Sequence, residues 1–143
     1  MFQNILICSF STKNNKQVID VSFELAKKFD SKITLLKCIH KELPTFALFH
    51  TKSEKKKQEQ LTKEIQKVLD ETEELAKQNN ISLKTESSFV ESLSGYVSSY
   101  VNKNNIDLFV ADSTPPSEIS VNDHKDIVNN IYKNIDCPIL TLK

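Results

Sequence analysis

The sequence predicts an α/β fold: one open, parallel, five-stranded sheet with helices on both faces. Short apolar runs of strand length alternate with longer stretches whose apolar residues recur every three or four positions, in the order β-α-β-α-β-α-β-α-β. Such alternation favours right-handed crossovers between parallel strands, with helices covering both sides of the sheet. The chain has 143 residues, 38% of them hydrophobic, which is the size of one domain, so we expect a single unit over residues 1–143.

The first strand and the first helix are predicted near the N-terminus. NILIC, residues 4–8, is a short apolar run of the kind found in strands that are buried on both faces. An amphipathic helix follows, with Ser11 or Thr12 available as its cap and Asp30-Ser31 as its end. KITLLKCI, residues 32–39, is the second strand. The inward-facing positions of the helix are Val18, Val21, Ser22, Leu25, Ala26 and Phe29.

The middle of the chain predicts a long helix that begins at Leu61 and ends at Gln78-Asn79-Asn80. Upstream of it, KSEKKKQEQ, residues 52–60, places four lysines near the positive end of the helix dipole, so we expect a solvated or frayed first turn. Acidic residues interleave with these lysines and no aromatic stacking partner accompanies them, which favours a solvated face over a nucleic-acid patch. The apolar positions of the helix are Leu61, Ile65, Val68, Leu69, Thr72, Leu75 and Ala76.

The last third of the chain supplies the remaining elements. They are a half-exposed strand at 81–87, a helix at 91–103, a buried strand at 106–111, a helix capped by Asn122 or Asp123 that runs through Ile135, and a strand at 137–142. Gly95 is the only glycine of the chain, although helices commonly end on a glycine in the left-handed conformation. Asn79-Asn80 and Asn104-Asn105 occupy those positions, and asparagine is the next-best residue for them.

The charge balance excludes several classes of partner. Basic and acidic residues number 19 each, which gives no electrostatic footprint for nucleic acid or for an anionic membrane. Every basic residue is a lysine, so a bidentate guanidinium clamp for phosphate is absent from the sequence. No secretory leader and no apolar run of membrane-spanning length is present, so we expect a cytoplasmic protein. Cys8, Cys38 and Cys137 are odd in number and lack CxxC spacing, as is typical of reduced thiols that pack as small apolar residues.

Four segments along the chain stand out as a set: MFQNILI, the helix-to-strand segment ELAKKFDSKITLLK, Gly95 at the opening of a helix that leads to NNIDLFVADS, and the terminal DCPILTLK. In this order they resemble the universal stress protein family. The resemblance covers essentially the whole chain and is least distinctive near residues 50–80. It implies a five-stranded, Rossmann-like parallel sheet of the adenine nucleotide α-hydrolase type and a cytoplasmic homodimer joined partly through the last strand. It does not imply an enzyme, and we predict none.

The resemblance also bears on nucleotide binding, because some members of that family bind ATP and others do not. Binding members carry an acidic residue soon after the first strand, where this chain has Phe10. They also carry a glycine-rich loop after the fourth strand, whose first glycine falls at or near Asp112 and whose final pair falls at Lys125-Asp126. Glycines there let backbone N–H groups approach phosphates, whereas the prolines at 115 and 116 have no N–H to donate.

Four acidic residues in the same region, Asp112, Glu118, Asp123 and Asp126, would also repel a polyphosphate. We therefore expect a member that lacks the ATP-binding glycine motif and uses no cofactor. The degenerate pocket has as its candidate residues Ser9, Phe10, Cys38, Asp112, Ser113, Thr114 and Lys125.

The residues give weaker support to three more specific hypotheses, namely a metal site, nucleophilic catalysis and a redox-sensitive thiol. Cys8, Cys38 and His40 match no recognised zinc spacing, so apolar packing and a solvated histidine are favoured and no metal site is predicted. Asp123-His124 lies near two serines, but without a nucleophile elbow the residues favour helix capping with an exposed His124, and no catalytic residue is predicted. Cys8 precedes a helix N-terminus, which raises the hypothesis of a lowered thiol pKa and a redox-sensitive group.

The last strand completes the functional prediction. It should lie at the sheet edge with its backbone row open to another chain, and pairing with a second copy would bury Ile139, Leu140 and Leu142. The sequence thus favours a stress-response or regulatory module that acts through dimerisation and contacts with an unidentified protein partner. The alternative is a small-molecule sensor that binds AMP, a cyclic nucleotide or another metabolite in a modified pocket at the carboxyl ends of the strands.

Overall fold

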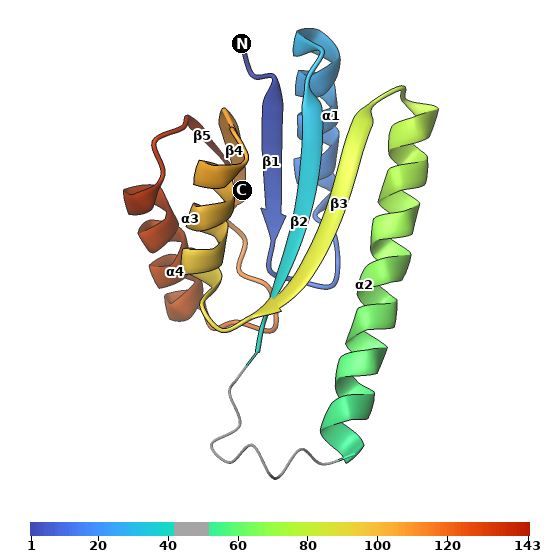
Figure 1. Cartoon of the computed structure of the whole chain (residues 1–143), viewed down its shortest axis with the longest axis vertical. Helices are drawn as coiled ribbons and strands as arrows, with labels where there is room; N and C mark the ends of the chain where they lie inside the picture. The colour runs from blue at the N-terminus through green and yellow to red at the C-terminus, as the bar shows by residue number, and fades with distance from the viewer. Residues whose placement is uncertain (42–51) are drawn as a thin grey trace.

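The computed structural model describes residues 1–41 and 52–143 and contains the nine predicted elements in the predicted order (Figure 1). They pack as a sheet between two pairs of helices, which confirms the α/β fold class. The elements are β1 (Asn4–Ser9), α1 (Lys16–Phe29), β2 (Lys32–His40), α2 (Lys52–Gln78), β3 (Ser82–Val90), α3 (Leu93–Lys103), β4 (Leu108–Asp112), α4 (Val121–Asn134) and β5 (Ile139–Leu142).

The sheet has the strand order β3-β2-β1-β4-β5, and all four strand pairs are parallel. The chain winds outward from β1 to β3 and then returns to place β4 on the other side of β1. The order therefore reverses between β1 and β4, and the carboxyl ends of these two strands form the switch point at which open α/β sheets usually bind ligands.

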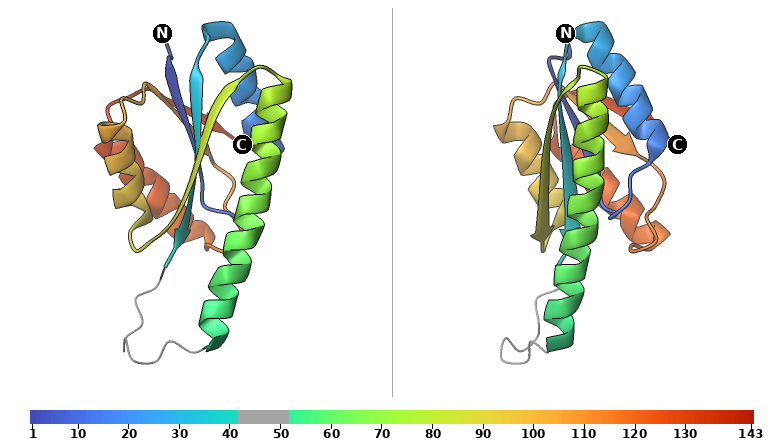
Figure 2. Two further views of the ribbon diagram at one scale, coloured as in Figure 1. Left: turned by 45° about the vertical axis from the view of Figure 1, so that its right-hand side comes forward. Right: turned by 90° about the vertical axis from the view of Figure 1, so that its right-hand side faces the viewer.

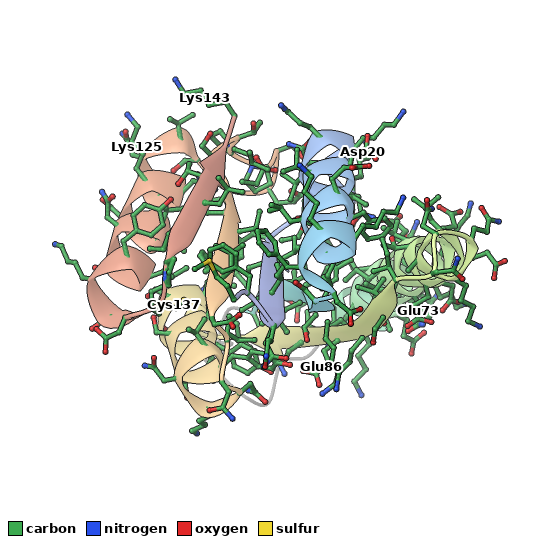
Figure 3. All side chains as sticks on the ribbon, turned by 90° about the horizontal axis from the view of Figure 1, so that it is seen from above. Asp20, Glu73, Glu86, Lys125, Cys137 and Lys143 are labelled. Carbon is green, nitrogen blue, oxygen red and sulfur yellow. The ribbon has the colours of Figure 1, made fainter. Side chains whose placement is uncertain are left out.

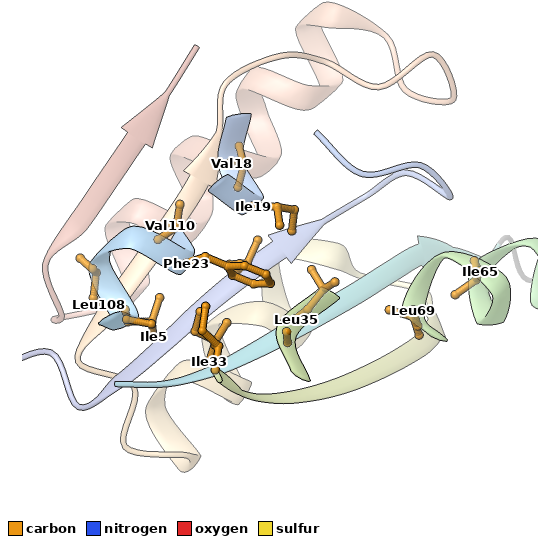
Figure 4. Packing of buried hydrophobic residues seen from close by; sticks show 14 residues of the cluster. Ile5, Val18, Ile19, Phe23, Ile33, Leu35, Ile65, Leu69, Leu108 and Val110 are labelled. Carbon is orange, nitrogen blue, oxygen red and sulfur yellow. The ribbon is translucent and has the colours of Figure 1, made fainter. Parts of the chain in front are cut away.

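Each face of the sheet is covered by two helices, α1 with α2 on one side and α3 with α4 on the other (Figures 1 and 2). Alternation along β1 divides its side chains between two cores: Ile5 and Ile7 face α1 and α2, whereas Leu6 and Cys8 face α3 and α4. Figure 4 shows the first of these cores, with Phe23 of α1 packed over Ile5 and Ile33. Because both faces are buried, the central strands are mostly apolar, with Lys37 of β2 as a buried exception.

The start of α1 differs from the prediction. Asn15 caps the helix, and its side-chain oxygen accepts a hydrogen bond from the backbone N–H of Gln17. Neither Ser11 nor Thr12 caps α1, because the β1–α1 loop continues past them before the helix begins. The helix ends at the predicted Asp30, which takes a left-handed conformation with φ 52°.

The long helix α2 begins at Lys52 instead of Leu61, so the segment upstream of Leu61 is helical and not frayed. The alternative expectation, a solvated segment, is confirmed for residues 54–60, which are exposed. Lysine, glutamate and glutamine are strong helix formers, and residues 54–60 extend the helix with exposed side chains and without a buried face. Its 27 residues correspond to about 40 Å. The N-terminal turns of α2 accordingly reach beyond the ends of the strands (Figure 2).

The two helices of the other face are capped by serines. Ser92 caps α3 and Ser120 caps α4, so the predicted caps Asn122 and Asp123 lie inside the first turn of α4. A Cβ atom added to Gly95 would lie 3.0 Å from the Ser92 hydroxyl oxygen, which is the atom that accepts the Gly95 N–H. The single glycine therefore permits a close cap, and it has no positive φ.

The asparagines at the helix ends behave as predicted. Asn80 and Asn105 take the left-handed conformation, with φ of 56° and 54°. Strand boundaries move by one to three residues: β3 continues to Val90, β4 runs from Leu108 to Asp112, and β5 begins at Ile139. Within the described ranges, no helix has the length and apolar content needed to cross a membrane.

Candidate functional site

A small cavity of about 170 Å³ lies at the switch point, where the loops after β1 and β4 meet. Ile7, Leu35 and Phe109 contribute apolar side chains from the strands, and the two loops contribute mostly polar ones. Pockets for drug-sized ligands occupy roughly 300–1,000 Å³, so this cavity suits a smaller molecule. The remaining lining residues are Cys8, Ser9, Phe10, Ser11, Lys13, Asn14, Asn15, Val18, Ile19, Ala111, Asp112, Thr114, Pro115 and Pro116.

A buried lysine of β2 forms hydrogen bonds with the β1–α1 loop. Lys37 has no exposed surface, and its Nζ donates to the Ser9 hydroxyl at 3.2 Å, the Ser11 carbonyl at 3.0 Å and the Lys13 carbonyl at 3.1 Å. Burial lowers the pKa of Lys37 to about 8, although the charges of Cys8 and Glu118 act in the opposite direction. The Lys37 ammonium thus holds Ser9, Ser11 and Lys13 in place through these three hydrogen bonds.

Asp112 joins the two loops across the cavity. One carboxylate oxygen accepts the side-chain N–H of Asn15 at 3.1 Å, and the other accepts the backbone N–H of Thr114 at 2.9 Å. Asn15 uses its own oxygen to cap α1, so the first turn of that helix is connected to the end of β4 through one side chain. The N–H of Thr114, which a phosphate cradle would direct at its ligand, is taken by the protein itself.

Phe10 of the β1–α1 loop contacts His124 of α4. Their rings are arranged edge to face, with centroids 6.3 Å apart. His124 is 4% exposed, so the expected exposed histidine is wrong. Its position inside the second turn of α4 points it at the loop after β1 instead of at solvent. Burial lowers the pKa of His124, and the nearby Asp112 carboxylate partly offsets that effect.

The thiol of Cys8 does not have the lowered pKa that a redox-sensitive group would need. Burial raises the pKa of Cys8 well above its ordinary value, the neighbouring Cys38 thiol raises it further, and Lys37 only partly counteracts them. Both cysteines are free and buried in the core beneath α3 and α4. The hypothesis of an activated Cys8 thiolate is therefore wrong, since a thiolate in this apolar core is poorly solvated.

The structure places only some of the candidate pocket residues together. Ser9, Phe10, Asp112 and Thr114 line the cavity. Cys38 faces the core below α3 and α4, the Ser113 hydroxyl donates to the carbonyl of Leu142 in β5, and Lys125 is exposed on the outer side of α4 (Figure 3). Sequence reasoning missed Lys37, Asn14 and Asn15. For Lys37 a signal existed, because a lysine interrupts the otherwise apolar strand KITLLKCI.

A second, more open groove of about 490 Å³ lies between the N-terminal ends of α3 and α4. Its polar lining carries four carboxylates, those of Glu91, Glu118, Asp123 and Asp126, together with His40 at the end of β2. Across residues 1–41 and 52–143, no group of three or more histidine, cysteine or acidic residues is arranged to hold a metal ion. The charge of this groove is unfavourable for a polyphosphate.

No protein-family model and no curated protein matches the sequence. Solved structures do match it along its full length. The universal stress protein UspA from Lactobacillus plantarum has a TM-score of 0.74 at 17% identity, with 99% of this chain and 98% of that chain covered. A universal stress protein family member from Burkholderia pseudomallei has a TM-score of 0.70 at 12% identity, with coverages of 99% and 96%.

A third match is the universal stress protein from Archaeoglobus fulgidus in complex with dAMP. It has a TM-score of 0.64 at 9% identity and covers 100% of both chains. Sequence identities of 9–17% show that the backbones share a fold. They do not show that the side chains of the site are equivalent. The chain therefore has the fold of the universal stress proteins.

Proposed function

We propose that this chain is a stress-response or regulatory module of the universal stress protein type that does not bind ATP in the usual mode. The fold supports the first part. The observation that carries the second is the loop after β4, where Asp112 accepts the Thr114 N–H and two prolines follow. Such a loop offers few free N–H groups for phosphates, and the cavity beside it measures about 170 Å³.

The module acts through contacts between proteins, beginning with a second copy of itself. β5 is the last strand of the sheet, so one backbone edge of it has no neighbouring strand among residues 1–41 and 52–143. Ile139, Leu140 and Leu142 are half-buried there, which leaves apolar surface for a partner strand to cover. We also place the protein in the cytoplasm, as the resemblance of its sequence to the universal stress protein family implies, and we assign it no catalytic role.

A second candidate function is supported by the cavity itself. It lies at the switch point, has an apolar floor and a polar rim, and keeps the position at which open α/β sheets bind ligands. One structural neighbour is a complex with dAMP. Under this alternative hypothesis the protein senses a small molecule, namely AMP, a cyclic nucleotide or another metabolite.

Thermal unfolding with added nucleotides tests the proposal. A ligand at about 100 times its Kd stabilises a protein by about 2.7 kcal/mol, which is a shift of several degrees for a domain of this size. We expect no saturable shift of Tm with magnesium-ATP at millimolar concentration, measured against magnesium chloride at equal ionic strength. A saturable shift with ATP would overturn the proposal, and a shift with AMP or dAMP alone would favour the sensor.

A further inference from the structure

His124 is a buried histidine at the junction of α4, the β1–α1 loop and the end of β4. It is 4% exposed and lies near the start of α4, which Ser120 caps. Its ring meets the ring of Phe10 edge to face, with 6.3 Å between the centroids, and the Asp112 carboxylate is close enough to act on its pKa. His124 therefore connects α4 to the two segments that surround the cavity.

The cavity rim on this side is built from residues next to His124. Phe10, Asp112 and Thr114 line the cavity, whereas His124 is not part of the lining and reaches it through Phe10. The carboxylate of Asp112 accepts hydrogen bonds from the Asn15 side chain at 3.1 Å and from the Thr114 backbone at 2.9 Å. The contact between Phe10 and His124 adds α4 to this arrangement of loops.

The observed packing suits a neutral imidazole. Burial lowers the pKa of His124 below its ordinary value of 6.5, and the charge of Asp112 offsets this effect only in part. A proton on His124 would thus place an incompletely compensated charge in a buried position, which costs free energy. The ring would regain hydration by moving outward, away from Phe10.

The other charged groups around His124 do not compensate it. Among residues 1–41 and 52–143, Asp112 is the one charged group that acts on the pKa of His124. Lys37 of β2 donates to the β1–α1 loop, and the charge of Glu118 acts on Lys37. The remaining charged side chains of the two loops and of the first turns of α4 are exposed, namely Lys13, Glu118, Asp123, Lys125 and Asp126.

We propose that His124 is an acid-sensitive latch: when its imidazole takes up a proton, the start of α4 separates from the β1–α1 loop and the rim of the cavity opens. Phe10 then loses the ring against which it packs. The latch goes beyond the proposed function, because it operates whether the module works through protein contacts or through a ligand. It supplies a regulatory module with a signal, which is the proton concentration.

Acid favours the open conformation. With His124 in water, the open form takes up the proton at the ordinary pKa of 6.5, whereas the closed form takes it up only at lower pH. The opening equilibrium therefore rises as pH falls, by at most about tenfold per pH unit for one proton. From pH 7 to pH 5 we expect a rise of about fivefold or more.

Labelling of Cys8 measures the opening, because Cys8 lines the cavity and is only 5% exposed. A pyridyl disulfide, which reacts with thiols at acid and neutral pH, is added to Cys137→Ser protein and to the same protein carrying His124→Phe. The phenylalanine keeps a ring against Phe10 but cannot take up a proton. We expect the labelling rate with histidine, divided by the rate with phenylalanine, to rise about fivefold or more from pH 7 to pH 5. An unchanged ratio would overturn the proposal.

Two controls locate the effect. His40→Gln removes an exposed histidine at the end of β2 and should leave the rise in Cys8 labelling as it is. Cys38 has no exposed surface in the core beneath α3 and α4, so it should stay unlabelled while Cys8 reacts. Equal labelling of Cys8 and Cys38 would mean that the whole domain unfolds in acid, which would overturn a local latch.

Titration of the wild-type imidazole by NMR decides the matter even if His124→Phe does not fold. The midpoint of His124 should lie below the ordinary pKa of 6.5, because the closed conformation disfavours the proton. A midpoint at or above that value would overturn the proposal, since the closed conformation would then accommodate the charge.

Discussion

At the scale of single residues, Lys37 makes the stability of the protein depend on pH. Its pKa is about 8 in the folded chain and 10.5 for the ordinary side chain. Between these values the unfolded chain holds a proton that the folded chain has released, so the free energy of unfolding rises as pH rises. Below pH 8 both states are protonated, and the buried ammonium costs the folded protein about 3 kcal/mol.

Urea denaturation of wild type and Lys37→Met across this range measures the effect. From pH 7 to pH 9.5 we expect the free energy of unfolding of the wild-type protein to gain about 2 kcal/mol relative to the variant, because only the wild type carries this proton. Lys32→Met removes an exposed lysine from the same strand and should show no comparable gain. A constant difference between wild type and Lys37→Met would mean that the Lys37 ammonium is as well solvated when folded as when unfolded.

At the scale of elements, the link between α1 and β4 depends on one asparagine. Asn15 caps the helix with its oxygen and donates to Asp112 with its nitrogen, so it orients the β1–α1 loop against the end of β4. A helix cap contributes about 1 kcal/mol, and a hydrogen bond to a charged group about 1.5–3 kcal/mol. The position of the cavity rim therefore depends on both halves of this amide.

Two substitutions separate the capping role of the Asn15 side-chain oxygen from the donor role of its nitrogen. Asn15→Ala removes the cap and the donor, and we expect it to lower the free energy of unfolding by about 3 kcal/mol. Asn15→Ser keeps a capping oxygen but not the amide donor, so it should lose about 1 kcal/mol less. Hydrogen exchange of the Thr114 amide should accelerate in both variants. Equal stability of Asn15→Ala and wild type would contradict the structural role of Asn15.

At the scale of the whole molecule, the proposed dimer depends on the free edge of β5. The carbonyls of Pro138 and Leu142 accept hydrogen bonds from Phe109 and Ser113, so alternation turns the N–H of Thr141 toward the open edge. Thr141→Pro removes that N–H and leaves the bonds to β4 in place. Thr141→Ala is the control, because it removes only the exposed hydroxyl that pairs with Tyr132.

Sedimentation at micromolar concentration should show a dimer for the wild-type protein and Thr141→Ala, and a monomer for Thr141→Pro. Circular dichroism should be the same for all three proteins, which would separate a lost interface from a lost fold. A monomeric wild-type protein, or a dimer that survives Thr141→Pro, would contradict assembly through this edge.

Much of the fold could be predicted because its signals are local. Apolar runs and helical spacing located all nine elements, and the left-handed Asn80 and Asn105 followed from the need to end helices without glycine. Predictions failed where local signals compete. Before α1, the polar segment 11–15 contains Asn14 and Asn15 as well as the predicted caps Ser11 and Thr12, and the folded chain uses Asn15. The first turns of α2 follow from helix propensity alone, which a search for an apolar face does not detect.

The sequence by itself determined the parallel α/β fold and the absence of glycine from the loop after β4, since both depend on residue type and spacing along the chain. Only the tertiary structure decided the chemistry of the cavity. Lys37, Asn15 and Asp112 come from β2, the β1–α1 loop and β4, and their hydrogen bonds exist only when the strands are paired side by side. Burial, too, is a property of the packed molecule: it made His124 a core residue and raised the pKa of Cys8, where sequence position suggested the reverse.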